Sequence, residues 1–134
     1  MGIDFTSVRS GPGFQVASLI EGGISVLAPA APTLVTDGVS LAGMTGLSLS
    51  AATSDGASTF NAAGQFNGYW LPPGSTVWLP LQDAIYPMIL AGLKQFGWIP
   101  QLVGISAGRF AIRPSGIVLV GGGSTVDITY RVQS

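Results

Sequence analysis

Residues 66–81 read FNGYWLPPGSTVWLPL, and this stretch holds four of the twelve aromatic residues of the chain. Two apolar, aromatic runs flank the sequence PPGS at residues 72–75. Proline fixes φ and glycine allows a positive φ, so PPGS is typical of a turn. The aromatic and β-branched residues on either side suit a pleated, half-buried surface. We therefore expect residues 66–81 to form the central hairpin of a small β core.

Further along the chain, two segments show strict alternation of apolar and polar residues. Residues 125–132 place Val126, Ile128 and Tyr130 on one face, and residues 45–53 alternate in the same way. This period is typical of half-buried antiparallel strands. Turn signals recur roughly every eight to twelve residues, a spacing found in all-β domains. The sequence therefore predicts an all-β fold, an antiparallel β-sandwich or a jelly-roll-like barrel.

One segment, near residues 83–95, fits a short helix as well as it fits a strand. Four of its apolar residues fall at helical spacing: Ile85, Met88, Ile89 and Leu93. Asp83 could cap such a helix, and Pro87 would lie in its first turn, where a missing N–H costs least. A strand or an irregular bulge is the alternative.

The chain is long enough for one domain, which needs no crosslink or metal to fold. We expect residues 24–134 to form a single β domain. Residues 1–23 are expected to form an arm that docks on this body or on a neighbouring chain. Within the arm, residues 14–20 could be a short strand or a single helical turn.

Charge is unusually sparse, with eleven charged residues making up 8% of the chain. No basic patch is present, which argues against nucleic-acid binding. The longest apolar run, residues 84–93, is too short and too broken to cross a membrane. Because a free monomer normally keeps a charged surface, we expect a chain that packs against copies of itself, as a homo-oligomer, or against partners.

The residue types present argue against most reaction chemistry. The chain has no cysteine and no histidine, which removes thiolate sites and the commonest metal ligand, and we expect no metal or cofactor. Residues 104–108 match G-x-S-x-G, but that elbow needs a histidine base and a following helix. A β turn is the preferred interpretation, with a hydrolase acting through Ser106 as a remote hypothesis. We therefore expect that the protein is not an enzyme.

Aromatic and arginine residues are the candidates for contact with a partner, because both types are enriched at interfaces. The candidate interface residues are Tyr69, Trp70, Trp78, Trp98, Arg109 and Arg113. The aromatic rings could equally belong to the core or stack on a sugar. The arginines could pair with acids of a neighbouring chain, pair within the chain, or remain solvated.

Four segments together resemble the auxiliary structural proteins of tailed-bacteriophage virions, of the capsid decoration or head-surface type. They are DGVSLAGMTGLSLSAAT at residues 37–53, GQFNGYWLPP at 64–73 with the following Trp78, GRFAIRPSG at 108–116 and GGGSTVDITYRV at 121–132. Proteins of this kind are all-β, cysteine-poor and glycine-rich, and have no catalytic residues.

This resemblance implies a non-enzymatic capsid decoration protein that binds the shell in many copies and stabilises it. Its partners would be the major capsid protein or other virion subunits, and its location the virion, assembled in the host cytoplasm. The sequence leaves open whether it belongs to head or tail. The alternative is a carbohydrate-binding module of a phage host-recognition device, or another tail structural component.

Overall fold

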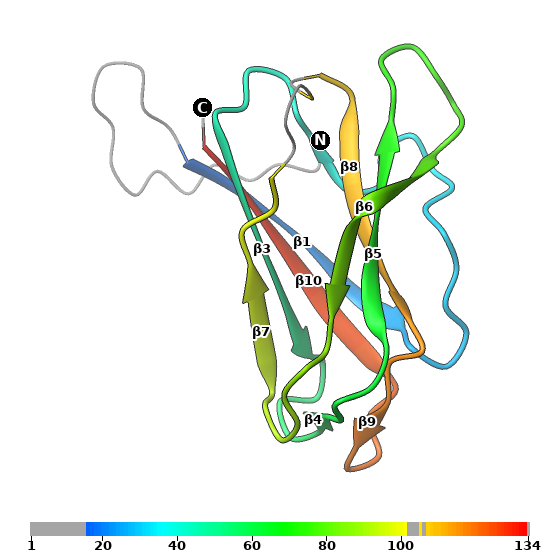
Figure 1. Ribbon diagram of the computed structural model, residues 1–134, viewed down its shortest axis with the longest axis vertical. Helices are drawn as coiled ribbons and strands as arrows, with labels where there is room; N and C mark the ends of the chain where they lie inside the picture. The colour runs from blue at the N-terminus through cyan, green and yellow to red at the C-terminus, as the bar shows by residue number, and fades with distance from the viewer. Residues whose placement is uncertain (1–15, 102–104, 106, 134) are drawn as a thin grey trace.

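The computed structural model describes residues 16–101, 105 and 107–133. Among these residues the chain forms strands and no helix, which confirms the all-β prediction. Two four-stranded antiparallel sheets pack face to face as a sandwich that does not close into a barrel (Figure 1).

The strands fall into three groups. In spatial order, the first sheet contains β1 (Val16–Ser25), β10 (Thr125–Gln133), β3 (Gly46–Thr53) and β7 (Gln95–Trp98). The second sheet contains β2 (Val39–Ser40), β8 (Arg109–Ser115), β5 (Gln65–Leu71) and β6 (Leu79–Pro87). A two-stranded ladder of β4 (Thr59–Phe60) and β9 (Leu119–Val120) lies at one end.

Apart from β4 and β9, the strands pair as one long hairpin that is folded over on itself. β5 pairs with β6, β3 with β7, β2 with β8, and β1 with β10, all antiparallel. Successive pairs lie in alternate sheets, which is the order of a double-sheet jelly roll. The predicted central hairpin at residues 66–81 is the tip of this long hairpin, and its turn is closed by a 3.0 Å bond from Ser75 N–H to the Pro72 carbonyl.

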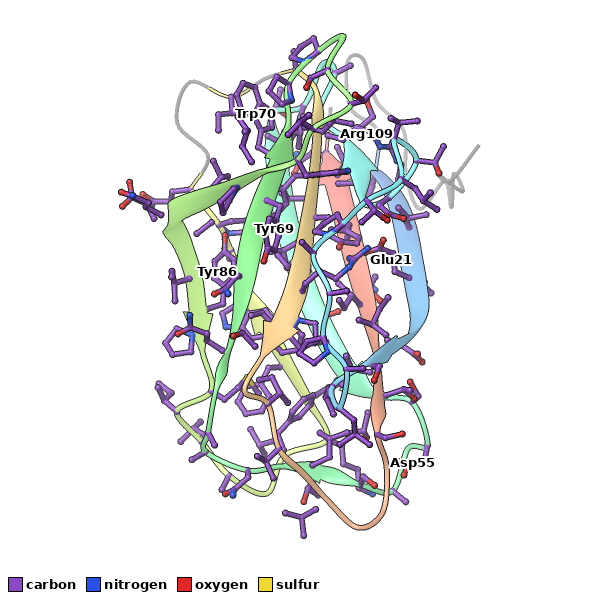
Figure 2. The ribbon with its side chains drawn as sticks, turned by 90° about the vertical axis from the view of Figure 1, so that its right-hand side faces the viewer. Glu21, Asp55, Tyr69, Trp70, Tyr86 and Arg109 are labelled. Carbon is purple, nitrogen blue, oxygen red and sulfur yellow. The ribbon has the colours of Figure 1, made fainter. Side chains whose placement is uncertain are left out.

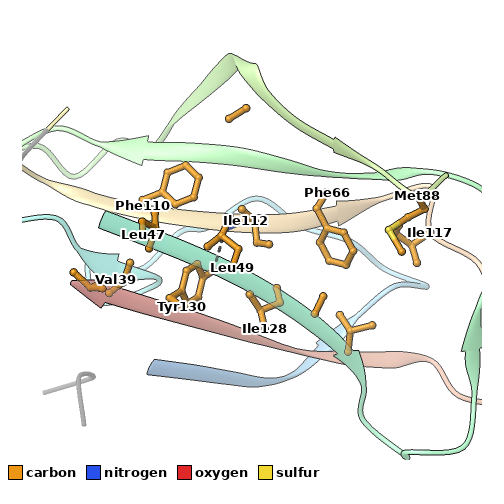
Figure 3. Packing of buried hydrophobic residues seen from close by; sticks show 14 of the residues in the cluster. Val39, Leu47, Leu49, Phe66, Met88, Phe110, Ile112, Ile117, Ile128 and Tyr130 are labelled. Atoms are coloured by element: carbon orange, nitrogen blue, oxygen red, sulfur yellow. Dashed lines mark hydrogen bonds between the residues drawn. The ribbon is translucent and has the colours of Figure 1, made fainter. Parts of the chain in front are cut away.

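The core lies between the two sheets. β3 and β10 alternate strictly between buried and half-buried positions along most of their length, as predicted. Leu49 and Tyr130 from the first sheet meet Ile112 and Phe66 from the second (Figure 3). Phe66, Ile112 and Tyr130 are fully buried, so the strands that carry them fix the thickness of the sandwich.

The short helix expected near residues 83–95 is not formed. This segment contributes to β6 and β7 instead, joined by residues 88–94. Met88 is buried, but Ile85, Ile89 and Leu93 are exposed, so the four residues at helical spacing share no buried face. The local pattern was overridden by tertiary pairing, because β5 offers an open edge to which β6 hydrogen-bonds.

Part of the expected N-terminal arm is a strand of the body. Residues 16–23 belong to β1, which pairs with β10 from Val16 opposite Gln133 to Ser25 opposite Thr125. A bulge between Glu21 and Ile24 interrupts this ladder. Residues 1–15 lie outside the described residues.

Residues 26–38, which we call the strap, cross the outer face of the second sheet. Figure 2 shows this segment running between Tyr69 and Glu21. Trp78 is buried against Leu71 and Ala111, and its indole N–H donates to the Leu34 carbonyl at 3.0 Å. The strap therefore covers this face of the sandwich, whereas the outer face of the first sheet carries Ser48, Ser50, Thr129 and Arg131.

Candidate functional site

The aromatic candidates on the tip hairpin hold the chain itself together. Trp70 packs against the core, and its indole N–H donates to the Ala107 carbonyl at 2.9 Å. Tyr69 packs against the small cluster of Leu71, Trp78 and Ala111. With both indole N–H groups satisfied inside the molecule, these rings act mainly as internal anchors.

Trp98 ends β7 and belongs to an aromatic cluster at the open side of the sandwich. Its ring centroid lies 5.4 Å from that of Phe66 and 5.8 Å from that of Tyr86, distances typical of packed rings. The carbohydrate-binding alternative needs two exposed rings on one face. Every tryptophan and tyrosine that the structure describes is buried or half-buried, so they form no such platform.

Arg109 fastens the end of the strap to β8. Its Nε donates to the Asp37 carbonyl at 2.9 Å, and its Nη2 donates to the carbonyls of Thr36 and Gly38 at 3.0 and 2.8 Å. Burial lowers the pKa of the Arg109 guanidinium, and the charges of Glu21 and Asp37 oppose that effect.

Arg113 forms a buried ion pair with Glu21, which lies on the opposite sheet. Arg113 Nη1 lies 2.8 Å from Glu21 Oε1, and Nη2 lies 3.1 Å from Oε2. Glu21 also accepts hydrogen bonds from the Tyr130 hydroxyl and from Gly38 N–H. The Tyr130 hydroxyl in turn accepts the N–H of Ile112 at 3.0 Å. Of the three possibilities that the sequence left open for Arg113, pairing within the chain is the one observed.

The environment of this network fixes its protonation. Burial alone would lower the pKa of Arg113, but the hydrogen bonds and charge of Glu21 raise it overall. Burial and the charge of Glu21 raise the pKa of the Tyr130 hydroxyl well above its usual value. Arg113 and Tyr130 therefore stay protonated at neutral pH, as expected for a structural lock rather than for acid–base chemistry.

Little else in the described residues suggests a reacting centre. Ser106 and Gly104 of the G-x-S-x-G match lie outside those residues. Gly108 has a φ of +85° and a Cβ there would lie 2.2 Å from the Leu71 carbonyl, so its conformation and its packing both require glycine. No group of three potential metal ligands occurs in the part of the chain that the structure describes.

Within residues 16–101, 105 and 107–133, no helix has the length and apolar character needed to cross a membrane.

The most distinctive surface feature is exposed apolar area. Thirteen large apolar side chains among the described residues are at least 42% exposed, more than the eleven charged residues of the whole chain. Two segments at the end of the sandwich that carries β4 and β9, residues 88–94 and residues 118–120 (Figure 1), carry five of them: Ile89, Leu90, Leu93, Val118 and Val120. We call these five residues the end patch.

The two segments that carry the end patch are both hydrogen-bonded to β4 or to the residue after it. Phe60 of β4, fully buried, donates its N–H to the Leu93 carbonyl at 2.8 Å and accepts the N–H of Gly92 at 2.9 Å. The next residue, Asn61, donates to the Val118 carbonyl at 2.9 Å. β4 therefore ties the segment carrying Leu93 to the segment carrying Val118, which holds the apolar side chains at one end.

A second feature is the outer face of the first sheet. It carries a shallow hollow of about 490 Å³, lined by Ser48, Leu49, Ser50, Gln95, Phe96, Gly97, Thr129 and Arg131. Arg131 is the one charged residue in this described lining. The hollow is open and polar, unlike the strap-covered face on the other side of the sandwich.

Sequence reasoning did not single out Glu21 or the end patch, whereas Arg131 was grouped with Arg109 and Arg113 as a residue that could pair with acids of a neighbouring chain. Two residues of the patch, Ile89 and Leu93, stood out in the sequence, but their helical spacing suggested a buried face. Glu21 carries no local signal, because its partner lies 92 positions away. Comparison of the chain with protein-family models, curated proteins and solved structures finds no match.

Proposed function

We propose that the chain is a non-enzymatic virion structural protein, a capsid decoration protein that binds the shell in many copies and stabilises it. Its partners would be the major capsid protein or other virion subunits. The observation that carries this proposal is the end patch, a group of exposed apolar side chains on a chain with few charges.

The size of the end patch is consistent with binding in many copies. Burying one Ile, Leu or Val side chain completely contributes about 1.5–3 kcal/mol. The five residues are roughly half exposed, so covering them would contribute on the order of 5 kcal/mol. Association itself costs about 4–15 kcal/mol in lost freedom of motion. One such contact alone is marginal, but a lattice that holds neighbours close makes repeated contacts effective.

The fold supports the same proposal by analogy. Double-sheet jelly rolls occur in viral capsid proteins and in lectins. A fold alone does not assign a function, so the choice between these two classes depends on the surface. The half-buried aromatic rings suit a lectin poorly, whereas the end patch suits a subunit that packs against others. The resemblance of the four sequence segments to phage decoration proteins points the same way.

Purified virions of a phage whose genome encodes this chain provide the test. Mass spectrometry should find the chain in hundreds of copies per particle, and shells that lack it should rupture at a lower temperature. Ile89→Asp should abolish binding to such shells, because it places a charge in the end patch. Leu27→Asp is the matched control, since Leu27 is 79% exposed against 75% for Ile89 but lies on the strap.

Two results would refute the proposal. One is the absence of the chain from purified particles. The other is full binding of Ile89→Asp to shells, provided that urea unfolding shows that both variants are as stable as the parent chain.

A further inference from the structure

Most charged side chains that the structure describes are engaged within the chain. Glu21, Asp37 and Arg113 form one group, and Arg109 holds three carbonyls of the strap. Asp127 accepts hydrogen bonds from Ser54 and Gly23, and Asp55 accepts three within its own turn. Three described charged side chains make no hydrogen bond or ion pair: Asp83, Lys94 and Arg131.

Arg131 lies in the hollow on the outer face of the first sheet. On the neighbouring strand β3, Ser48 lies opposite Arg131 and Ser50 lies opposite Thr129. Residues paired across strands are close neighbours on one face, so hydroxyl groups flank the guanidinium. Among the residues that the structure describes, no acid lines the hollow. An arginine flanked by hydroxyl donors can bind a carboxylate through charge-assisted hydrogen bonds.

Gly97 keeps this hollow open, although the fold does not require a glycine there. Its φ is not positive, and a Cβ would lie 3.5 Å from the Leu49 carbonyl, an ordinary contact. By contrast, Gly68 in the core has no room for a Cβ, which would lie 2.5 Å from that of Ala84. The missing side chain at residue 97 therefore creates space on the surface rather than relieving strain.

Asp83 lies on a bulged part of β6. The β5–β6 ladder pairs Tyr69 with Pro80 and Asn67 with Ile85, so residues 81–84 of β6 lie opposite Gly68 alone. Such a bulge bends the strand away from its neighbour and re-aims side chains. Figure 2 shows β6 standing away from β5. Leu81 packs against the core and Ala84 is buried, whereas Gln82 and Asp83 are exposed at the free edge of the second sheet, where they line a second hollow together with Tyr86 and Ile99. We call Gln82 and Asp83 the knob.

We propose that the hollow on one copy of this chain binds the knob of a second copy, with the Asp83 carboxylate against the Arg131 guanidinium. This inference rests on the proposed function, because it names a neighbour in the assembly. The argument for a second copy is complementarity of charge. The knob carries the one unpaired acid among the described residues, and the described lining of the hollow contains an unpaired cation and no acid.

The two surfaces differ, so each copy binds one neighbour through its hollow and another through its knob. Contacts of this head-to-tail kind build a ring if the rotation closes and a filament if it does not. The contact is distinct from the end patch, which remains free to bind a different partner.

A charge-swap experiment on the full chain tests the proposal. Sedimentation velocity over a range of concentrations measures self-association of the parent chain, Asp83→Arg, Arg131→Asp and the double variant. Each single reversal should weaken self-association about 30-fold or more, since it sets like charges against each other. The double variant should recover to within about tenfold of the parent chain. Lys94→Glu is the matched control, because Lys94 is the other unpaired cation, and it should leave self-association unchanged.

A second pair of variants tests the shape of the hollow. Gly97→Leu should weaken self-association by filling the hollow, whereas Gly97→Ala should have a smaller effect. Urea unfolding of every variant verifies that a loss of association is not a loss of folding.

Three results would overturn the inference. One is a parent chain that self-associates with no response to the reversals. Another is a parent chain that stays monomeric at all concentrations. The third is saturable binding of citrate that is lost in Arg131→Asp while self-association is unaffected, which would make the hollow a small-anion site. The proposed function is judged separately, by the binding of Ile89→Asp to shells.

Discussion

Glu21 and Arg113, which lie 92 positions apart in the sequence, form the ion pair that joins β1 of the first sheet to β8 of the second. The same carboxylate holds Gly38 at the end of the strap and the hydroxyl of Tyr130. Two sheets and the strap thus meet at one side chain. A buried pair of this kind adds little net stability, but removal of one partner leaves an uncompensated buried charge.

Glu21→Gln should therefore lower the free energy of unfolding by about 3 kcal/mol or more. Urea denaturation followed by tryptophan fluorescence measures this change. Asp83→Asn is the matched control, because it makes the same chemical change at an exposed, unpaired carboxylate, and it should stay within about 0.5 kcal/mol of the parent chain. A loss below about 1 kcal/mol for Glu21→Gln would contradict the role of the pair.

Stability should fall at alkaline pH. Burial raises the pKa of Tyr86 from 10.0 to about 12. Burial and the charge of Glu21 together raise the pKa of Tyr130 well above its usual value. The unfolded chain therefore releases these protons first, while the folded chain keeps them. The contribution of these two tyrosines to the free energy of unfolding is complete below pH 10 and is lost as the pH rises towards 12 and above.

Free energies of unfolding in urea at several pH values up to 12 check this prediction, with tyrosinate absorbance as a direct readout. Tyr86→Phe should make the decline shallower, because it removes one of the two groups. A free energy of unfolding that stays level up to pH 12 would show that these hydroxyls titrate normally.

Gly68→Ala should destabilise the second sheet by about 1–3 kcal/mol. The new Cβ would lie 2.5 Å from that of Ala84 and 3.0 Å from the ring of Phe110, so the strands would have to separate. Gly68→Ala combined with Ala84→Gly should recover part of the loss. Gly97→Ala, also a strand glycine, should change the free energy of unfolding by less than about 0.5 kcal/mol, because a Cβ fits there. Equal effects at residues 68 and 97 would contradict this assignment.

Trp78→Ala should release the strap and lower the free energy of unfolding by about 3 kcal/mol, since it removes a buried ring and the hydrogen bond to Leu34. Hydrogen exchange should then speed up across residues 26–38 more than in β3 or β10. Val77→Ala, at a 63% exposed neighbour, serves as the control and should leave exchange unchanged. Uniform acceleration over the whole chain would instead indicate global destabilisation.

The parts of the fold that local patterns encode could be predicted. The alternation in residues 45–53 and 125–132 corresponds closely to β3 and β10, and the turn PPGS corresponds to the tip hairpin. The order of strands in the sheets could not be predicted, because it joins distant residues such as Val16 and Gln133. Periodicity reports which face is buried but not which strand lies beside it.

The sites were harder to predict than the fold. Arg113 stood out as a candidate, but its partner Glu21 carries no pattern of its own, so pairing within the chain could not be chosen in advance. Residues 85–93 had helical spacing, yet β5 needed a partner strand, and Ile89 and Leu93 were left on the surface. A local spacing rule fails wherever a pairing made elsewhere in the fold is stronger.

The central place of β10 has a consequence for biosynthesis. β10 lies between β1 and β3, but the ribosome makes it long after both. Until it emerges, those two strands have no shared neighbour, and the first sheet cannot close. The sandwich can therefore be completed only after β10 has been synthesised. Until then, the edges of β1 and β3 are open to aggregation, and chaperones have time to act on the nascent polypeptide.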